Sequence, residues 1–265
     1  MRAYIAGVAV WGPGLPGWAD SRAVLAGETP YQPTEMGLPV PEILSANERR
    51  RTGATVRLAL VVAHRAMQMA GMPPGSIASV FGCSNGDGAV VHAILETLAG
   101  PDRQVSPTQF HNSVHNAAAG YWSIATHSRQ PAATLTGQDE TFAAALLKAM
   151  AELHVEHQPI LVCVHDTPIP GPMAEKRPIL APFAACLVLT PEPCARTIAC
   201  IGVTYEPTRR VAEEGTMLAS LLPLALGNPA ARALPLLELL ARRQPGRTRA
   251  RLQHGAITID VQPWP

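Results

Sequence analysis

The distribution of short, almost wholly apolar segments is the feature of this chain that most limits its fold. Residues 77–83, 159–164 and 184–189 are segments of this kind. Before and between them lie longer segments in which apolar residues recur three and four positions apart, as Val56, Leu60 and Ala63 do. Strands that are apolar on both faces are typical of parallel sheets buried beneath helices. The alternation predicts an α/β fold with a mostly parallel sheet covered by helices on both faces.

The same patterns place the individual elements. Strands are expected at residues 3–12, 77–84, 132–136, 159–166, 184–190, 197–206, 249–255 and 256–262, and helices at residues 45–72, 88–100, 115–128, 141–153 and 231–243. Ser45 with Glu48 resembles a capping box, and Gly71 marks the end of that helix. A Pro- and Gly-rich loop is expected between residues 13 and 41. We expect residues 1–265 to form one domain, with a soft boundary inside residues 207–227.

Composition excludes several classes of function. Hydrophobic residues make up 47% of the 265 residues and charged residues 15%, which is typical of a globular chain with a large interior. A formal charge of +1 provides no general attraction to nucleic acid or to an anionic membrane. No apolar run is long enough to span a bilayer. The first residues resemble a secretory signal, but Gly and Pro interrupt the apolar stretch, which we interpret as the first strand.

The cysteines indicate the compartment. The chain has five, at Cys83, Cys163, Cys186, Cys194 and Cys200, with no CxxC pair. Three of them lie inside apolar, strand-like runs. We interpret all five as reduced core residues and predict a cytoplasmic protein.

A strand-to-helix elbow at residues 130–150 suggests an active site. In many enzymes such an elbow presents a nucleophile where the N-terminus of the helix stabilises negative charge. Here the elbow offers Gln138, Asp139, Glu140 and Thr141, with neither Cys nor Ser at its tip. The elbow is therefore either a catalytic turn without its nucleophile or a simple helix cap.

Three further patterns have alternative interpretations. Residues 82–86 form a G-x-S-x-G motif centred on Ser84, and Asp166 and His254 follow in the order of an α/β-hydrolase triad. No HGGG-like oxyanion segment accompanies the motif, so we prefer to interpret it as a tight strand–helix turn. His111 and His115 have the spacing of two metal ligands on one helix face, but no acid accompanies them. Arginines cluster at Arg49, Arg50 and Arg51 and again at Arg242, Arg243, Arg247, Arg249 and Arg251, and they form either a solvated face or a docking site for an acidic partner or a phosphate.

Residues 106–149 resemble the N-terminal half of β-ketoacyl synthases, which have the thiolase fold. The ungapped run "SPTQFHNSVHNAAAGYWSI" (residues 106–124) carries most of the likeness, and more narrowly it resembles the short, chain-length-factor-like synthase relatives of aryl polyene gene clusters. The resemblance covers about residues 3–205. It implies a thiolase-like layered α/β fold with a complete N-terminal half (1–205) and a truncated C-terminal region (206–265).

The resemblance also implies that the catalytic groups are missing. Synthases display a Cys on the elbow and use two C-terminal His residues, whereas this chain has Gln138, or in an alternative alignment Asp139, at the Cys position. Beyond His165 its only histidine is His254, and the HGTGT and NxFGFGG segments are absent. We therefore expect no catalytic residue and no condensation by this chain alone. No metal and no cofactor are expected; substrates would travel on the phosphopantetheine of an acyl carrier protein.

The expected function follows from the resemblance: a non-catalytic partner subunit that forms a heterodimer with a β-ketoacyl synthase and shapes its acyl pocket. The strand at residues 132–136 would pair across the dimer. The predicted interface and pocket residues are Phe110, Asn112, His115, Asn116, Tyr121, Trp122, Thr134, Thr136 and Phe142, and the predicted carrier-docking residues are Arg49, Arg50 and Arg51.

Three alternatives remain open. Gln-bearing loading domains of polyketide synthases decarboxylate malonyl carrier, although that chemistry also uses the paired His. A serine hydrolase would use Ser84. A homodimer would use the same interfacial strand as an adhesive edge.

Overall fold

A computed structural model describes residues 1–207 and 218–265 of the chain. Within these residues eight strands form one sheet in the order β3-β2-β4-β5-β1-β6-β8-β7. The pairs β2–β3 and β2–β4 are parallel, and the other five pairs are antiparallel. The α/β class is as predicted, but the prediction of a mostly parallel sheet is wrong. Helices cover both faces of this mixed sheet, so its inner strands are as apolar as the strands of a parallel sheet, and the sequence pattern does not distinguish the two.

The elements lie close to the expected positions. The strands are β1 (Arg2–Trp11), β2 (Ala78–Gly82), β3 (Ala132–Leu135), β4 (Ile160–Asp166), β5 (Phe183–Thr190), β6 (Ala199–Glu206), β7 (Gly246–Leu252) and β8 (Gly255–Pro263). The helices are α1 (Trp18–Ala26), α2 (Ala46–Arg51), α3 (Ala54–Ala70), α4 (Gly88–Ala99), α5 (Pro107–Asn112), α6 (Ala117–Thr126), α7 (Thr141–Glu156), α8 (Met173–Lys176), α9 (Leu222–Gly227) and α10 (Leu234–Arg242), with short 3-10 turns η1 (Gln138–Glu140), η2 (Ala219–Leu221) and η3 (Pro229–Ala233). The predicted boundary inside residues 207–227 falls largely on residues outside the described part.

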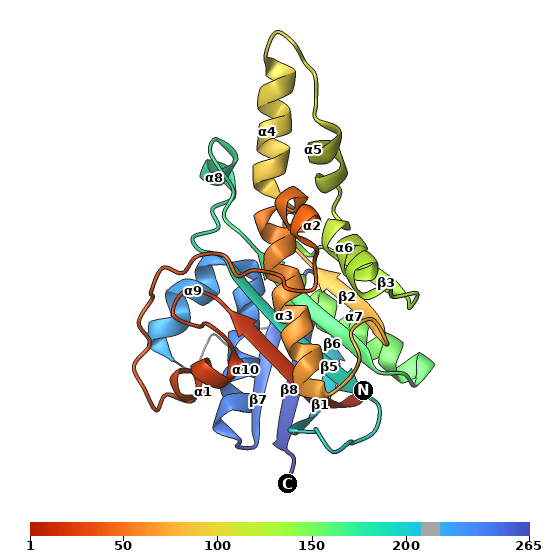
Figure 1. The fold of residues 1–265 in the computed structure, drawn as a ribbon. Coiled ribbons are helices and arrows are strands. Elements are labelled where there is room, and N and C mark those ends of the chain that lie inside the picture. Colours follow the sequence, from red (N-terminus) through yellow and green to blue (C-terminus); the bar gives the residue numbers. More distant parts are fainter. Residues whose placement is uncertain (208–217) are drawn as a thin grey trace.

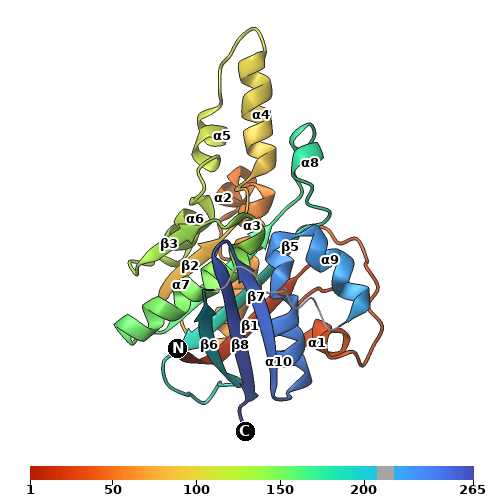
Figure 2. The same cartoon turned by 180° about the vertical axis from the view of Figure 1, so that it is seen from behind.

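Two layers of helices enclose the sheet (Figure 1). Helices α3 and α6 pack on one face, where Ala63, Met67 and Trp122 join the buried side of β1, β4 and β5. Helices α7 and α10 pack on the other face, which is seen from behind in Figure 2. Alternate residues of each inner strand therefore enter different cores, and both sets must be apolar.

The predicted helix at residues 45–72 is two helices. The Ser45 hydroxyl accepts a hydrogen bond from the Glu48 backbone N–H at 3.3 Å, which is one of the two bonds of a capping box. The backbone is extended at Thr52 and Gly53, so α2 ends there and α3 begins anew. Gly71 ends α3 in the left-handed conformation, as predicted.

Helices α4 and α5 form an arm that projects beyond the sheet (Figures 1 and 2). Gly88 is the only buried residue of α4. Asp87 caps the helix by accepting a hydrogen bond from the Val90 N–H at 3.2 Å. Leu95 and Phe110 are 51% and 68% exposed, so the arm presents apolar surface that the chain itself leaves uncovered.

Candidate functional site

The strand–helix elbow is a tightly bonded turn between β3 and α7. Its tip, Gln138, is in the left-handed backbone conformation with φ of 52°. The Thr141 hydroxyl accepts a hydrogen bond from the Gly137 N–H at 3.1 Å and donates one to the Gln138 carbonyl at 2.7 Å. A left-handed residue other than Gly costs free energy and persists only where its surroundings enforce it. The structure therefore makes Gln138 the apex of the elbow.

Ion pairs neutralise the two acids that follow the apex. Arg177, in the connection between β4 and β5, lies 2.8 Å from the Asp139 carboxylate. Arg251 of β7 lies 3.7 Å from the Glu140 carboxylate. The elbow thus presents a neutral, exposed amide at the N-terminal end of α7. An amide can donate and accept hydrogen bonds, but it cannot serve as an acyl-accepting nucleophile.

A buried polar cluster lies next to the elbow. The Thr136 hydroxyl donates to the Ser84 carbonyl at 3.0 Å. The backbone N–H and the hydroxyl of Ser84 both donate to Asp166 Oδ1 at 2.8 Å, and the Cys83 thiol lies 3.4 Å from the same oxygen. Burial raises the pKa of the Asp166 carboxyl to about 6, against the opposing effect of the hydrogen bonds from Ser84. The cluster joins the ends of β2 and β4 beneath the elbow.

The hydrolase interpretation of Ser84 finds only part of its triad. Ser84 and Asp166 are in direct contact, and the hydroxyl of Ser84 also accepts from the Asn85 amide at 2.8 Å. His254 is exposed in the turn between β7 and β8, where its carbonyl accepts from the Tyr205 hydroxyl. The predicted order Ser, Asp, His does not bring the three side chains into one hydrogen-bonded row. The G-x-S-x-G segment is a buried strand–helix turn.

The two histidines proposed as metal ligands have separate partners. Helix α5 ends at Asn112, so His111 and His115 do not share a helix face. His111 stands edge-on to the Tyr121 ring at 5.7 Å, and His115 Nε2 lies 2.9 Å from the Cys83 carbonyl. In the described part of the chain, no group of three or more His, Cys, Asp or Glu residues could hold a metal ion.

The buried environment of His165 was not visible in the sequence. Its side chain is 2% exposed beside the Phe81 ring, and neither ring nitrogen has a hydrogen-bond partner among the described residues. Burial, with a contribution from His115, lowers the pKa of the His165 imidazole to about 3. The sequence pattern did not predict this burial, because a strand position that faces the core can hold a His as well as a Val.

The predicted interface and pocket residues fall into three groups. Exposed residues are Phe110, Asn116 and Thr136; half-buried residues are His115 and Thr134; buried residues are Asn112, Tyr121, Trp122 and Phe142. The buried aromatic residues pack in the two cores of this chain. Only the first two groups are available to a partner.

The arginines differ in how far they are engaged. Arg49, Arg50 and Arg51 form the last turn of α2, and Arg50 and Arg51 are exposed. On β7, Arg247 and Arg249 pair with Asp260 at 2.6 Å and Glu206 at 3.3 Å, and Arg251 pairs with the elbow. The second arginine cluster is therefore largely neutralised by acids of the same chain.

The two outer strands of the sheet carry opposite kinds of side chains. The outer strand β7 (Gly246–Leu252) bears the three arginines just described. The outer strand β3 (Ala132–Leu135) bears no charge, and none of its residues is buried. Charged side chains protect an edge from pairing with other chains, and an uncharged edge leaves its N–H and C=O groups available. The edge next to the elbow is the open one.

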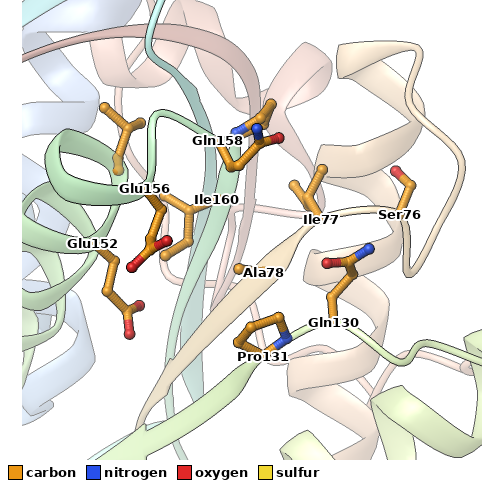
Figure 3. Close-up of a pocket in the computed structure, with 11 residues that line it drawn as sticks. Ser76, Ile77, Ala78, Gln130, Pro131, Glu152, Glu156, Gln158 and Ile160 are labelled. Carbon is orange, nitrogen blue, oxygen red and sulfur yellow. The ribbon is translucent and has the colours of Figure 1, made fainter.

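A hollow of about 370 Å³ lies at the N-terminal ends of β2, β3 and β4, beside the C-terminal end of α7 (Figure 3). Glu152 and Glu156 of α7 line one side, and Gln130, which leads into β3, lines the opposite side. Ala78 and Ile160 form the floor between them. The hollow adjoins the open edge at the end opposite the elbow.

Of the five cysteines, Cys194 is exposed and the other four are buried. All are free thiols, so the interpretation as core residues is wrong for Cys194, which lies in the turn between β5 and β6. No helix in the described part of the chain is both long and apolar enough to cross a membrane.

Solved structures with the same fold come from ketosynthase systems. One is the ketosynthase ApeO in complex with its chain length factor ApeC from Xenorhabdus doucetiae (TM-score 0.73, 18% identity, covering 98% of this chain and 99% of that chain). The ishigamide ketosynthase/chain length factor matches with a TM-score of 0.73 and 16% identity over 98% of this chain and 99% of that one. A β-ketoacyl synthase from Burkholderia phymatum matches over the whole of both chains (TM-score 0.70, 12% identity).

These likenesses confirm the thiolase-like fold expected from the sequence. No curated protein sequence matches the chain. Residues 21–221 match the family described as "Beta-ketoacyl synthase, N-terminal domain", which is most of the chain. The chain therefore belongs to the β-ketoacyl synthase N-terminal domain family.

Proposed function

We propose that this chain is a non-catalytic, chain-length-factor-like subunit that pairs with an active β-ketoacyl synthase in aryl polyene or related polyene biosynthesis. The observation that carries the proposal is the elbow. Its apex is Gln138, whose backbone is left-handed and whose side chain is a neutral amide, at the position where a synthase of this family needs a thiol. Claisen condensation needs both the thiolate and donors that stabilise the developing oxyanion. The sequence supplies neither the elbow Cys nor the C-terminal His motifs.

The open edge supports a pairing role. Strand β3 has one neighbour, β2, and its outer side carries no charged residue. The Thr134 hydroxyl is buried without a hydrogen-bond partner among the described residues. A strand of the synthase subunit that pairs with β3 would satisfy the free backbone groups and continue the sheet. The solved ketosynthase–chain length factor complex of X. doucetiae is a two-protein assembly of this fold.

The arm supports a role in shaping a pocket. Phe110 and Val114 are 68% and 45% exposed at the foot of the arm, on the segment that joins β2 to β3. Apolar side chains held this far from their own core are typical of a surface that a partner covers. Placed against a synthase subunit, they would line the space that receives the growing acyl chain.

The carrier protein would dock at α2. Arg50 and Arg51 are exposed at the end of this helix, and Arg51 also borders a shallow hollow with His111 and Tyr121. Arginine suits both the acidic surface of a carrier and the phosphate of its phosphopantetheine. One solved relative is a ketosynthase bound to a type II polyketide acyl-carrier protein.

Co-expression with the synthase of the same gene cluster tests the proposal. We expect the two chains to copurify as a 1:1 complex, and we expect the synthase to lose yield or elongation when expressed alone. Gln138→Cys should gain one alkylation by iodoacetamide at residue 138, beyond that of the exposed Cys194 in wild type, yet still fail to extend an acyl thioester, because the oxyanion apparatus is absent. Two-carbon extension by the purified wild-type chain alone would overturn the proposal, and release of carbon dioxide from malonyl carrier would favour the decarboxylase.

A further inference from the structure

The hollow at the N-terminal end of β3 is not explained by the elbow, the arm or the carrier site. It has a volume of about 370 Å³, and it adjoins the uncharged outer strand of the sheet (Figure 3). We propose that this hollow receives a basic side chain, Arg or Lys, from the synthase subunit, and so selects the partner that pairs with β3. The proposal rests on the proposed function, because it needs a partner at the β3 edge.

The position of the hollow follows from how two related subunits pair. Related strands that pair across a two-fold or pseudo-two-fold axis run antiparallel. The C-terminal end of the partner's strand would then lie beside Ala132, at the N-terminal end of β3 (Ala132–Leu135). Gln130 is two residues before that strand and lines the hollow. The segment that follows the partner's strand would therefore lie at the same end of the sheet edge as the hollow.

The charge of the hollow selects a cation. Glu152 and Glu156 are one helical turn apart on α7 and face Gln130 across the hollow (Figure 3). They stand in the last turns of α7, which ends at Glu156, where the helix dipole adds negative potential. The structure records an ion pair of Glu152 with Lys148 and, within the described residues, none for Glu156. One carboxylate is thus available to a cation from outside.

The shape of the hollow suits a long side chain. Between the polar walls the lining is apolar, formed by Ile77, Leu153 and Ile160. Lys and Arg bury an apolar stem and keep a charged head at a polar rim. In this hollow the apolar floor would contact the stem of such a side chain, and the carboxylates above it would pair with the charged head.

A second copy of this chain offers no free cation in that segment. The residues that follow its own β3 are Thr136, Gly137, Gln138, Asp139 and Glu140, and none of them is basic. Arg177 and Arg251 lie at the same elbow, but they already pair with its two acids. The chemistry of the hollow therefore favours a different subunit over self-pairing.

The test compares the affinity of variants for the co-expressed synthase subunit at low and high salt. Glu156→Gln and the double variant Glu152→Gln/Glu156→Gln keep the shape and remove the charge. Glu35→Gln, in the exposed loop before α2, is the matched control. We expect Kd to rise about tenfold or more for the double variant and to lose much of its salt dependence, with Glu35→Gln unchanged. Equal circular dichroism spectra and melting temperatures establish that each variant folds.

The outcomes separate this proposal from the proposed function. If wild type and the double variant bind the synthase equally at every salt concentration, the hollow has no such role, while the subunit pairing stands. If wild type does not bind the synthase at all, both are wrong. If the wild-type chain forms a tight homodimer that the same substitutions weaken, the occupant is a second copy, and the proposal of a basic side chain from another subunit is overturned.

Discussion

Asn228 joins the C-terminal region to the core, and its removal should be costly. The side chain is fully buried just before the turn η3. Its amide nitrogen donates to the Asp166 carbonyl at 3.2 Å and to the Ala181 carbonyl at 2.7 Å. Its carbonyl oxygen accepts from the N–H groups of Ala230 and Ala231 at 2.8 and 3.3 Å. One side chain thus connects β4, the start of β5 and η3.

The size of the effect follows from these four bonds. Each hydrogen bond contributes about 1 kcal/mol net, and an orphaned buried group costs about 1–3 kcal/mol. Asn228→Ala leaves the Asp166 and Ala181 carbonyls and the Ala230 N–H without that partner, whereas the Ala231 N–H keeps its bond to the Asn228 backbone carbonyl at 3.0 Å. We expect the free energy of unfolding to fall by about 4 kcal/mol. For a chain of this size the melting temperature should fall by roughly 10 °C.

Urea unfolding followed by circular dichroism measures the change. The variant should shift the midpoint to lower urea concentration with an unchanged slope. Asn116→Ala is the control, because Asn116 is exposed and its side chain caps no helix N–H; we expect a change within about 0.5 kcal/mol. A loss below about 1 kcal/mol for Asn228→Ala would refute the reasoning, since it would mean that the C-terminal region is held by apolar packing alone.

Three further variants test individual groups. Between pH 4 and 6 the two buried groups act in opposite senses, so each is measured as the difference in stability between a variant and wild type in urea titrations at stepped pH. Because burial raises the folded-state pKa of Asp166 from 3.8 to about 6, the contribution of this group to stability falls as pH rises from about 4 to 6, and Asp166→Asn should gain stability relative to wild type across that range; a difference that does not change with pH would contradict the buried carboxyl. Because burial lowers the folded-state pKa of His165 to about 3, the contribution of this group falls as pH falls from 6.5 towards 3, and His165→Leu should gain stability relative to wild type as pH falls and add about 1 kcal/mol at neutral pH; a destabilised variant would show that the imidazole is bonded in solution. Gln138→Gly should raise the free energy of unfolding by about 0.5–1 kcal/mol through its left-handed backbone, and a loss would show that the amide holds the elbow.

The positions of the elements could be predicted from the sequence, but the directions of the strands could not. Apolar runs mark buried strands whether their neighbours are parallel or antiparallel, so the mixed sheet was missed. Helix α1 was also missed, because its nine residues have little amphipathic contrast and follow a Pro- and Gly-rich turn. The break between α2 and α3 depends on Gly53, where an added Cβ would lie 2.0 Å from the Asp87 carboxylate. That contact joins residues far apart in the sequence.

The candidate site was predictable only where local sequence decides it. The elbow residues were identified because a strand, a Gly and an apolar helix adjoin. The ion pairs of Asp139 and Glu140 come from Arg177 and Arg251, which only the tertiary fold brings near. The contact of Ser84 with Asp166 was anticipated for a hydrolase, but the third member is elsewhere. The role of each motif therefore depends on contacts between residues that are far apart in the sequence.

The unequal edges of the sheet limit the size of any assembly. Strand β7 carries arginines along its length, whereas β3 carries none. Addition of one subunit at β3 uses the only uncharged edge in the described part of the chain. On the proposed pairing at β3, a further copy at the other edge would meet arginine side chains and their acidic partners instead of bare backbone, which disfavours continued stacking. The proposed pairing would therefore extend the sheet by one subunit and then stop, giving closed pairs rather than fibres.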